Sequence, residues 1–85
     1  MSINVGQIYK DCYDKIYIIT KKHSAIIVSK NKIVYRYNVI LQDGEVYDDF
    51  TEDEILNSLK LIAEYPTWQE AVNSVEFKGE EKNAE

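Results

Sequence analysis

The chain has 85 residues, of which 45% are hydrophobic and 29% are charged, and its formal net charge is −5 at pH 7. A chain this short forms at most one domain and buries only roughly 60% of the surface that it exposes when unfolded. A deep catalytic pocket would therefore compete with the core for apolar side chains. The single cysteine, Cys12, excludes an intramolecular disulfide and a four-cysteine metal site.

The N-terminus lacks the basic and apolar regions of a signal peptide. No apolar run reaches the roughly 18 residues that a membrane span requires. Together with the single cysteine, these features predict a soluble, cytoplasmic protein that does not engage a membrane.

The first half of the chain is patterned as β-strands. Residues 5–9, 15–21 and 24–29 are predicted as three short strands, because they are rich in β-branched and aromatic residues. Lys30, Asn31 and Lys32 form a predicted turn in which Asn31 suits a left-handed backbone. Residues 33–41 give the clearest strand signal, since their side chains alternate with a period of two. Asp43 and Gly44 then predict a hairpin whose return strand covers residues 45–50.

The pattern changes to a helical period after residue 50. Thr51 followed by Glu54 is a capping box, which predicts a helix that continues to the break at Pro66. The residues expected to face the sheet from this helix are Ile55, Leu56, Leu59 and Ile62. Thr67 and Glu70 repeat the capping pattern and predict a second short helix through about Ser74, with Trp68, Ala71 and Val72 as its buried side.

This order of elements predicts an α+β fold, with four to five short antiparallel strands followed by one or two C-terminal helices. A curled meander of this kind also fits a small SH3-like barrel. The domain is expected to cover residues 1–77, with Phe77 as a last apolar anchor. Residues 78–85 are polar and acidic and are predicted to be a disordered tail.

The charge is unevenly distributed. Residues 1–42 hold seven Lys or Arg and two acids, whereas residues 43–85 hold three lysines and thirteen acids. The densest acidic run consists of Asp43, Glu45, Asp48, Asp49, Glu52, Asp53 and Glu54. One interpretation is that these acids complement a helix dipole and a turn. A second is an acidic surface that meets a basic protein partner. A divalent-cation site is a third, although the spacing lacks the EF-hand pattern.

The basic, tyrosine-rich half has two interpretations as well. Lysines near strand ends commonly keep sheet edges soluble. In a nucleic-acid-binding module, by contrast, tyrosines stack on bases and cations contact phosphates. The candidate residues for that role are Tyr17, Lys21, Lys22, Lys32, Tyr35, Arg36 and Tyr37. The acidic sequence pI of about 4.8 opposes attraction to phosphate.

Catalytic motifs are missing from the sequence. His23 is the only histidine and Cys12 the only thiol, and the sequence has no phosphate-binding glycine loop, nucleophile elbow or paired-histidine metal motif. The sequence therefore predicts a protein that is not an enzyme and that uses no cofactor and no metal.

Three segments, residues 5–10, 33–41 and 62–74, resemble small uncharacterised proteins of Gram-positive phages and prophages. The resemblance covers about three quarters of the chain and includes no catalytic motif. It implies an accessory phage or mobile-element protein, and small acidic proteins of that kind often bind a host or defence protein.

Two functions are therefore expected from the sequence. The first is a non-catalytic protein-binding module that engages a host or defence protein through its acidic run, and the alternative is an SH3-like nucleic-acid-binding module that uses the basic sheet. The chain is expected to be a monomer or a homodimer, because small domains often complete their cores by association. An exposed edge at residues 5–9 or the apolar side of the second helix is the predicted contact.

Overall fold

The computed structural model describes residues 3–75, so Phe77 and the tail predicted at residues 78–85 lie outside the described part of the chain. The elements in chain order are β1 (Gln7–Lys10), β2 (Ile16–Ile27), a 3-10 turn η1 (Val28–Lys30), β3 (Lys32–Leu41), β4 (Val46–Thr51), α1 (Glu52–Ser58), β5 (Lys60–Glu64) and α2 (Trp68–Ser74). The five strands form one antiparallel sheet in the order β4-β3-β2-β1-β5. The predicted α+β class is confirmed. The SH3-like barrel is not, because the sheet is open.

Two strands predicted separately, at residues 15–21 and 24–29, are a single strand. β2 continues through Lys22 and His23 because β3 is long enough to pair with it, from Tyr17 opposite Leu41 to Ile27 opposite Lys32. The left-handed backbone predicted for Asn31 is confirmed, with φ 48°. The turn itself begins at Val28, two residues before its predicted start, because β2 ends at Ile27. Cross-strand pairing thus overrides the two polar residues that interrupt the apolar run.

The helix predicted to reach Pro66 ends at Ser58 instead. The capping box is confirmed, with the Thr51 side chain accepting a hydrogen bond from the Glu54 amide, but residues 60–64 form β5 on the outer edge of β1. Leu56 and Ile62, expected to face the sheet, are 44% and 47% exposed. Leu59, Leu61 and Ala63 alternate with the period of two of a strand, whereas Ile55, Leu59 and Ile62 fit a helical period, and pairing with β1 decides the outcome.

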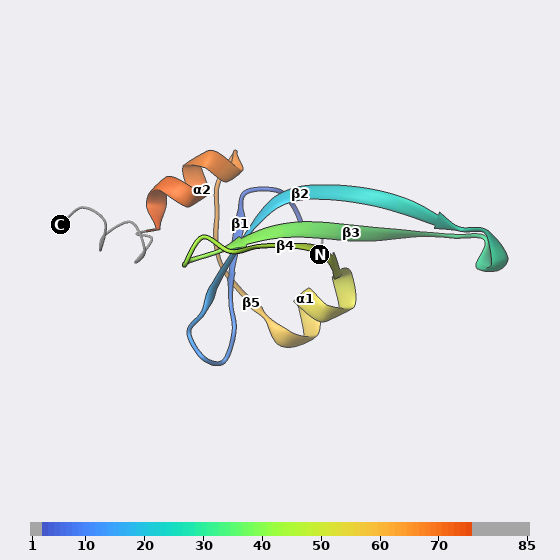
Figure 1. Ribbon diagram of the computed structural model, residues 1–85, viewed down its shortest axis with the longest axis horizontal. Helices are drawn as coiled ribbons and strands as arrows, with labels where there is room; N and C mark the ends of the chain where they lie inside the picture. Colours follow the sequence, from blue (N-terminus) through green and yellow to red (C-terminus); the bar gives the residue numbers. More distant parts are fainter. Residues whose placement is uncertain (1–2, 76–85) are drawn as a thin grey trace.

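Both faces of the sheet carry a hydrophobic core. On one face, hereafter the α1 face, Ile19, Tyr37 and Val39 pack with Ile55 of α1. On the opposite face, the α2 face, Ile8 and Ile18 pack with Ala71 of α2. Figure 1 shows the two helices on opposite sides of the strands. The helix predicted over residues 67–74 and the burial of Ala71 are confirmed.

β1 is an interior strand, flanked by β2 and β5. The prediction that residues 5–9 form an exposed edge available for association is therefore wrong. The sequence predicts a strand at this point but does not show that residues 60–64 cover its outer side, because those residues also fit a helical pattern.

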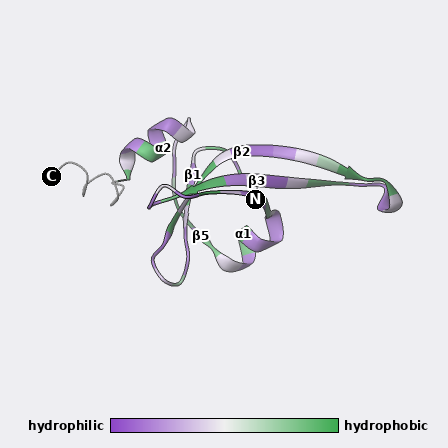
Figure 2. Cartoon of the chain, viewed as in Figure 1, coloured by the Kyte–Doolittle hydropathy of each residue, from purple (hydrophilic) through white to green (hydrophobic). Residues whose placement is uncertain are grey.

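β2 and β3 extend well beyond the other strands as a two-stranded ribbon, which we call the arm and define as residues 20–35. β1 pairs with β2 only at residues 16–18, and β4 pairs with β3 only from Arg36 onward. The arm gives the molecule its long axis, with extents of 53 × 21 × 20 Å (Figure 1). Figure 2 shows that the arm is hydrophilic near its middle, hydrophobic where its two strands approach the turn, and hydrophilic again at the turn itself.

Candidate functional site

The acidic residues of the β3–β4 turn stabilise the turn itself. The Asp43 carboxylate accepts a hydrogen bond from the Glu45 amide at 3.0 Å, and the Glu45 carboxylate accepts one from the Tyr47 hydroxyl at 2.9 Å. The Glu45 hydrogen bond and charge raise the pKa of Tyr47. Gly44 supplies the positive φ of 94° that the turn requires. Asp43 and Glu45 thus have local structural roles.

Asp48 and Asp49 lie in an irregularity of the edge strand β4. The β3–β4 register shifts so that Asn38 faces this pair of residues, and Asp49 has a left-handed backbone with φ 63°. Charges and bulges of this kind discourage a further strand from pairing with a sheet edge. These two acids therefore protect the outer edge of β4 from pairing with a further strand.

The three remaining acids lie in the first turn of α1, where they complement its dipole. Glu54 completes the capping box, because its carboxylate accepts a hydrogen bond from the Thr51 amide at 2.8 Å. Glu52 and Asp53 make no comparable cap and contribute to a groove beside the arm.

That groove has a volume of ≈330 Å³ and lies where β3 continues past the end of β4. One wall is residues 32–36 of β3, and the other is formed by Thr51, Glu52 and Asp53. Because Arg36 opposite Thr51 is the last β3–β4 pair, no described strand pairs with residues 32–35 on their β4 side, although β2 pairs with them on the other side. The groove therefore combines an open strand edge, exposed apolar side chains (Ile33 is 58% and Tyr35 41% exposed) and two carboxylates.

The sequence contains a signal for this groove in the lengths of its strands. The strand predicted over residues 33–41 is longer than its return strand over residues 45–50, and the helix cap at Thr51 follows directly. A hairpin whose two strands differ in length must leave part of the longer strand unpaired on that side. The acidic run indicates charge density, whereas the groove depends on strand length, which is why the groove was not among the predicted sites.

The residues predicted for nucleic-acid binding are divided between the two faces of the arm. Residues paired across antiparallel strands share a face, so the β2–β3 register places Lys22 and Tyr35 on the α1 face and His23 and Arg36 on the α2 face. Lys21 and Lys32 also belong to the α2 face. The Lys22 Nζ lies 4.9 Å from the centre of the Tyr35 ring, a cation–π geometry.

The two other predicted tyrosines are engaged within the domain. Tyr37 is fully buried in the core of the α1 face, so its ring is not available to stack on a base. Its hydroxyl has no hydrogen-bond partner within the described residues, and desolvation, with the Glu52 charge, raises its pKa. Tyr17 is half-buried beside Phe50, with ring centroids 6.1 Å apart, and donates a hydrogen bond to the Asp11 carboxylate at 2.9 Å.

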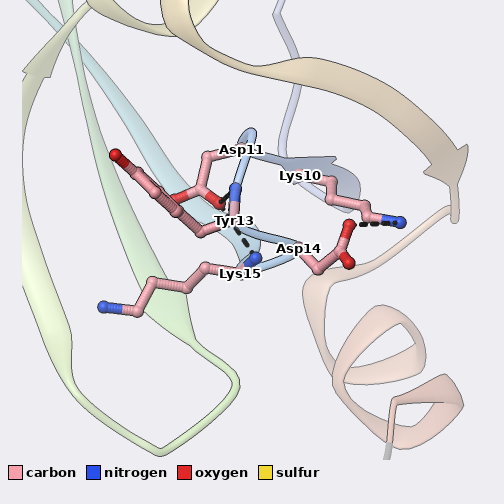
Figure 3. Close-up of polar contacts among 5 residues, drawn as sticks. All are labelled: Lys10, Asp11, Tyr13, Asp14 and Lys15. Carbon is pink, nitrogen blue, oxygen red and sulfur yellow. Dashed lines mark hydrogen bonds and ion pairs between the residues drawn. The ribbon is translucent and has the colours of Figure 1, made fainter.

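Asp11 organises the turn between β1 and β2. Its carboxylate accepts hydrogen bonds from the amides of Tyr13 at 2.8 Å and Lys15 at 2.9 Å, and Lys10 forms an ion pair with Asp14 at 3.1 Å (Figure 3). Desolvation opposes ionisation of Asp11, but the hydrogen bonds from Lys15, Tyr17 and Tyr13 together lower its pKa. Desolvation, followed by the hydrogen bond and charge of Asp11, raises the pKa of Tyr17 to about 12.

The contact between Tyr17 and Asp11 predicts that the folded protein loses stability in alkali. The pKa of Tyr17 is about 12 in the folded protein, against 10.0 for an unperturbed tyrosine, so the Tyr17 contribution is complete below about pH 10 and is lost as the pH rises toward about 12. Between about pH 9 and about pH 11, we expect the wild type to lose more stability in urea unfolding than Tyr17→Phe. The other tyrosines are present in both proteins, so their contributions to the pH dependence cancel in the comparison. Equal losses would contradict the assigned role of the Tyr17–Asp11 contact.

No group of three or more His, Cys, Asp or Glu side chains within residues 3–75 is arranged to hold a metal ion. In the same range, no helix is both long and apolar enough to cross a bilayer. Comparison of the chain with protein-family models, curated proteins and solved structures finds no significant match. The candidate site therefore rests on the geometry of this chain alone.

Proposed function

We propose that the protein is a non-catalytic protein-binding module, an accessory factor of a phage or mobile element that engages a host or defence protein. The observation that carries this proposal is the groove beside residues 32–36, where an open strand edge meets the acidic first turn of α1. Of the seven acids in the predicted binding surface, Glu52 and Asp53 are assigned the direct contact with the partner.

The occupant of the groove is an extended segment of the partner protein. An exposed strand edge offers backbone donors and acceptors to an added strand, and the alternating side chains of that strand supply specificity. Ile33 and Tyr35 offer apolar contact on the α1 face, and the two carboxylates favour a lysine or arginine on the segment. The resemblance to phage proteins supports a host target but does not identify it.

A second candidate function rests on the charge of the arm. No acidic residue occurs from Lys15 to Gln42, and Lys21, His23, Lys32 and Arg36 share the α2 face. A basic ribbon of this kind suits contacts with phosphates, which make the affinity fall steeply as salt rises. The fully buried Tyr37 and the half-buried Tyr17 leave Tyr35 as the exposed tyrosine of the predicted set, so phosphate contact rather than base stacking would dominate.

One experiment with two matched double variants separates these functions. Peptides are first enriched from a random displayed library on the wild-type protein. Their affinity is then measured for the wild type, for Glu52→Gln/Asp53→Asn and for Asp48→Asn/Asp49→Asn. The two double variants lose the same amount of charge. We expect selected peptides to pair basic with β-branched residues, and the groove variant to weaken their binding by about tenfold, as expected for charged contacts worth about 1 to 2 kcal/mol. The edge variant should bind as the wild type does.

Equal peptide binding by the two double variants, or no enrichment of peptides from the library, would refute the proposed role of the groove. The parallel measurement uses a fluorescent single-stranded oligonucleotide and Lys21→Gln/Arg36→Gln. Salt-dependent oligonucleotide binding that this variant weakens would favour the second function. Because Glu52 and Asp53 also complement the helix dipole, thermal unfolding of each variant must show that α1 remains folded.

A further inference from the structure

The outer edge of β2 is open along the whole arm. The last contact from the β1 side is the hydrogen bond from the Gly6 amide to the Ile19 carbonyl at 2.9 Å. From Thr20 to Ile27, no described strand pairs with this edge. The opposite side of β2 is covered by β3 throughout this stretch. The arm thus offers a long backbone edge on the side remote from the groove.

This edge lacks most of the features by which sheets avoid association. The outer edge of β4 has a bulge, a left-handed Asp49 and several acids, whereas residues 20–27 contain no proline, glycine or acid. Ile26 is 70% exposed and pairs with Ile33, which is 58% exposed. An isolated two-stranded ribbon is marginally stable in water, and additional strands stabilise it. Lys21 and Lys22 are the protective residues that this edge does possess, so any pairing has to accommodate both.

We propose that two copies of the chain associate by antiparallel pairing of their β2 edges about a two-fold axis through Ser24. An axis perpendicular to the sheet keeps each face continuous across the dimer, so residues that alternate to the same face must oppose each other. Centring on Ser24 pairs residues 21–27 of one copy with the same residues of the other. The pairing then ends at η1 on one side and just before the β1 contact at Ile19 on the other.

The same register also keeps the lysines of the two copies from lying opposite each other. It places Lys22 opposite Ile26 of the second copy, Lys21 opposite Ile27 and His23 opposite Ala25. No lysine faces a lysine, an arrangement that avoids the destabilising effect of like charges directly opposite each other. The aliphatic stems of the lysines cover the exposed Ile26 and the partly buried Ile27, while their ammonium groups remain in water. A register centred on Lys22 would set that residue against itself, and one centred on Lys21 would run into β1.

The dimer leaves the β3 edge and its groove free on both copies. The inference is thus independent of the proposed function, and each can fail separately. Sedimentation equilibrium of the full chain measures it directly. We expect the wild type to form a dimer with a dissociation constant in the micromolar range, in keeping with a small interface.

Charge substitutions at one position test the register. Ile26→Lys places a lysine opposite Lys22 and is expected to raise the dissociation constant at least about tenfold. Ile26→Glu places a carboxylate there and is expected to leave the constant within about threefold of the wild-type value, since charge attraction replaces apolar contact. Lys22→Glu added to Ile26→Lys should restore association.

The control is Val28→Lys, which adds the same charge to an 85% exposed residue in η1. It is expected to dimerise as the wild type does. A monomeric wild type at all concentrations up to several hundred micromolar would overturn the proposal. Equal effects of Ile26→Lys and Ile26→Glu, or no rescue by Lys22→Glu, would overturn the Ser24 register. Thermal unfolding shows that each variant is folded, and residue 26 contributes to neither core.

Discussion

Gly6→Ala is expected to destabilise the domain by more than about 3 kcal/mol, a large part of the total stability of a domain this small. Gly6 has φ 96°, a conformation that costs an L-residue roughly 1 to 2 kcal/mol. In addition, an alanine Cβ would overlap the Tyr65 carbonyl oxygen, and this neighbour is backbone that cannot rotate away.

The position of Gly6 prevents an easy adjustment. Its amide donates to the Ile19 carbonyl at 2.9 Å, and its carbonyl accepts from the Tyr65 amide at 3.0 Å. The residue thus connects β2 with the segment between β5 and α2. Moving residue 6 away from Tyr65 would break one or both hydrogen bonds, so the substitution affects the N-terminal and C-terminal parts of the fold together.

Gly44→Ala is the matched control. Gly44 also has positive φ, 94°, but an added Cβ would meet no atom within 4 Å. We therefore expect a loss of only about 1 kcal/mol, the conformational cost alone. Urea unfolding of the two variants measures the difference. Similar losses for both would show that the close approach of Gly6 to Tyr65 is not a significant constraint.

The second large effect concerns two consecutive residues. Ile18→Ala and Ile19→Ala are each expected to cost about 2 to 5 kcal/mol, the usual range for truncating a fully buried isoleucine. Both residues are 0% exposed although they point to opposite faces of β2. Ile18 packs in the core with Ala71, and Ile19 in the core with Ile55. Each substitution therefore leaves a cavity on a different side of the sheet.

Ile62→Ala is the comparison for this pair, since Ile62 is 47% exposed on β5. A loss below about 1 kcal/mol is expected there. If only one of Ile18→Ala and Ile19→Ala were strongly destabilising in urea unfolding, the sheet would be covered on one face only. That result would contradict the placement of α1 and α2 on opposite sides.

Local signals in the sequence predict the elements whose pattern has one solution. Asp43–Gly44, the cap at Thr51, the left-handed Asn31 and the alternation over residues 33–41 each correspond to the observed turn, helix start or strand. The predicted continuation of the first helix past Ser58 toward Pro66 is wrong. Leu59 and Ile62 fit a helical period, while Leu61 and Ala63 fit a strand. The decision depends on β1, which is distant in sequence and needs a partner on its outer side.

The candidate site is predicted less well than the fold for a related reason. Charge density identifies the acidic residues but cannot separate Asp43 and Glu54, whose carboxylates serve a turn and a cap, from Glu52 and Asp53 beside the groove. Residue type likewise groups the exposed Tyr35 with the buried Tyr37. Accessibility depends on how far each strand runs past its neighbour, which follows from sheet register rather than from composition.

The two cores take no side chain from residues 20–35. The cost of an altered arm is therefore small for the rest of the molecule, since the side chains that hold the sheet to its helices stay in place. Selection can change the length, charge or apolar content of this ribbon one cross-strand pair at a time without endangering the fold. A small protein under pressure from a changing partner would thus have a segment in which recognition evolves separately from stability.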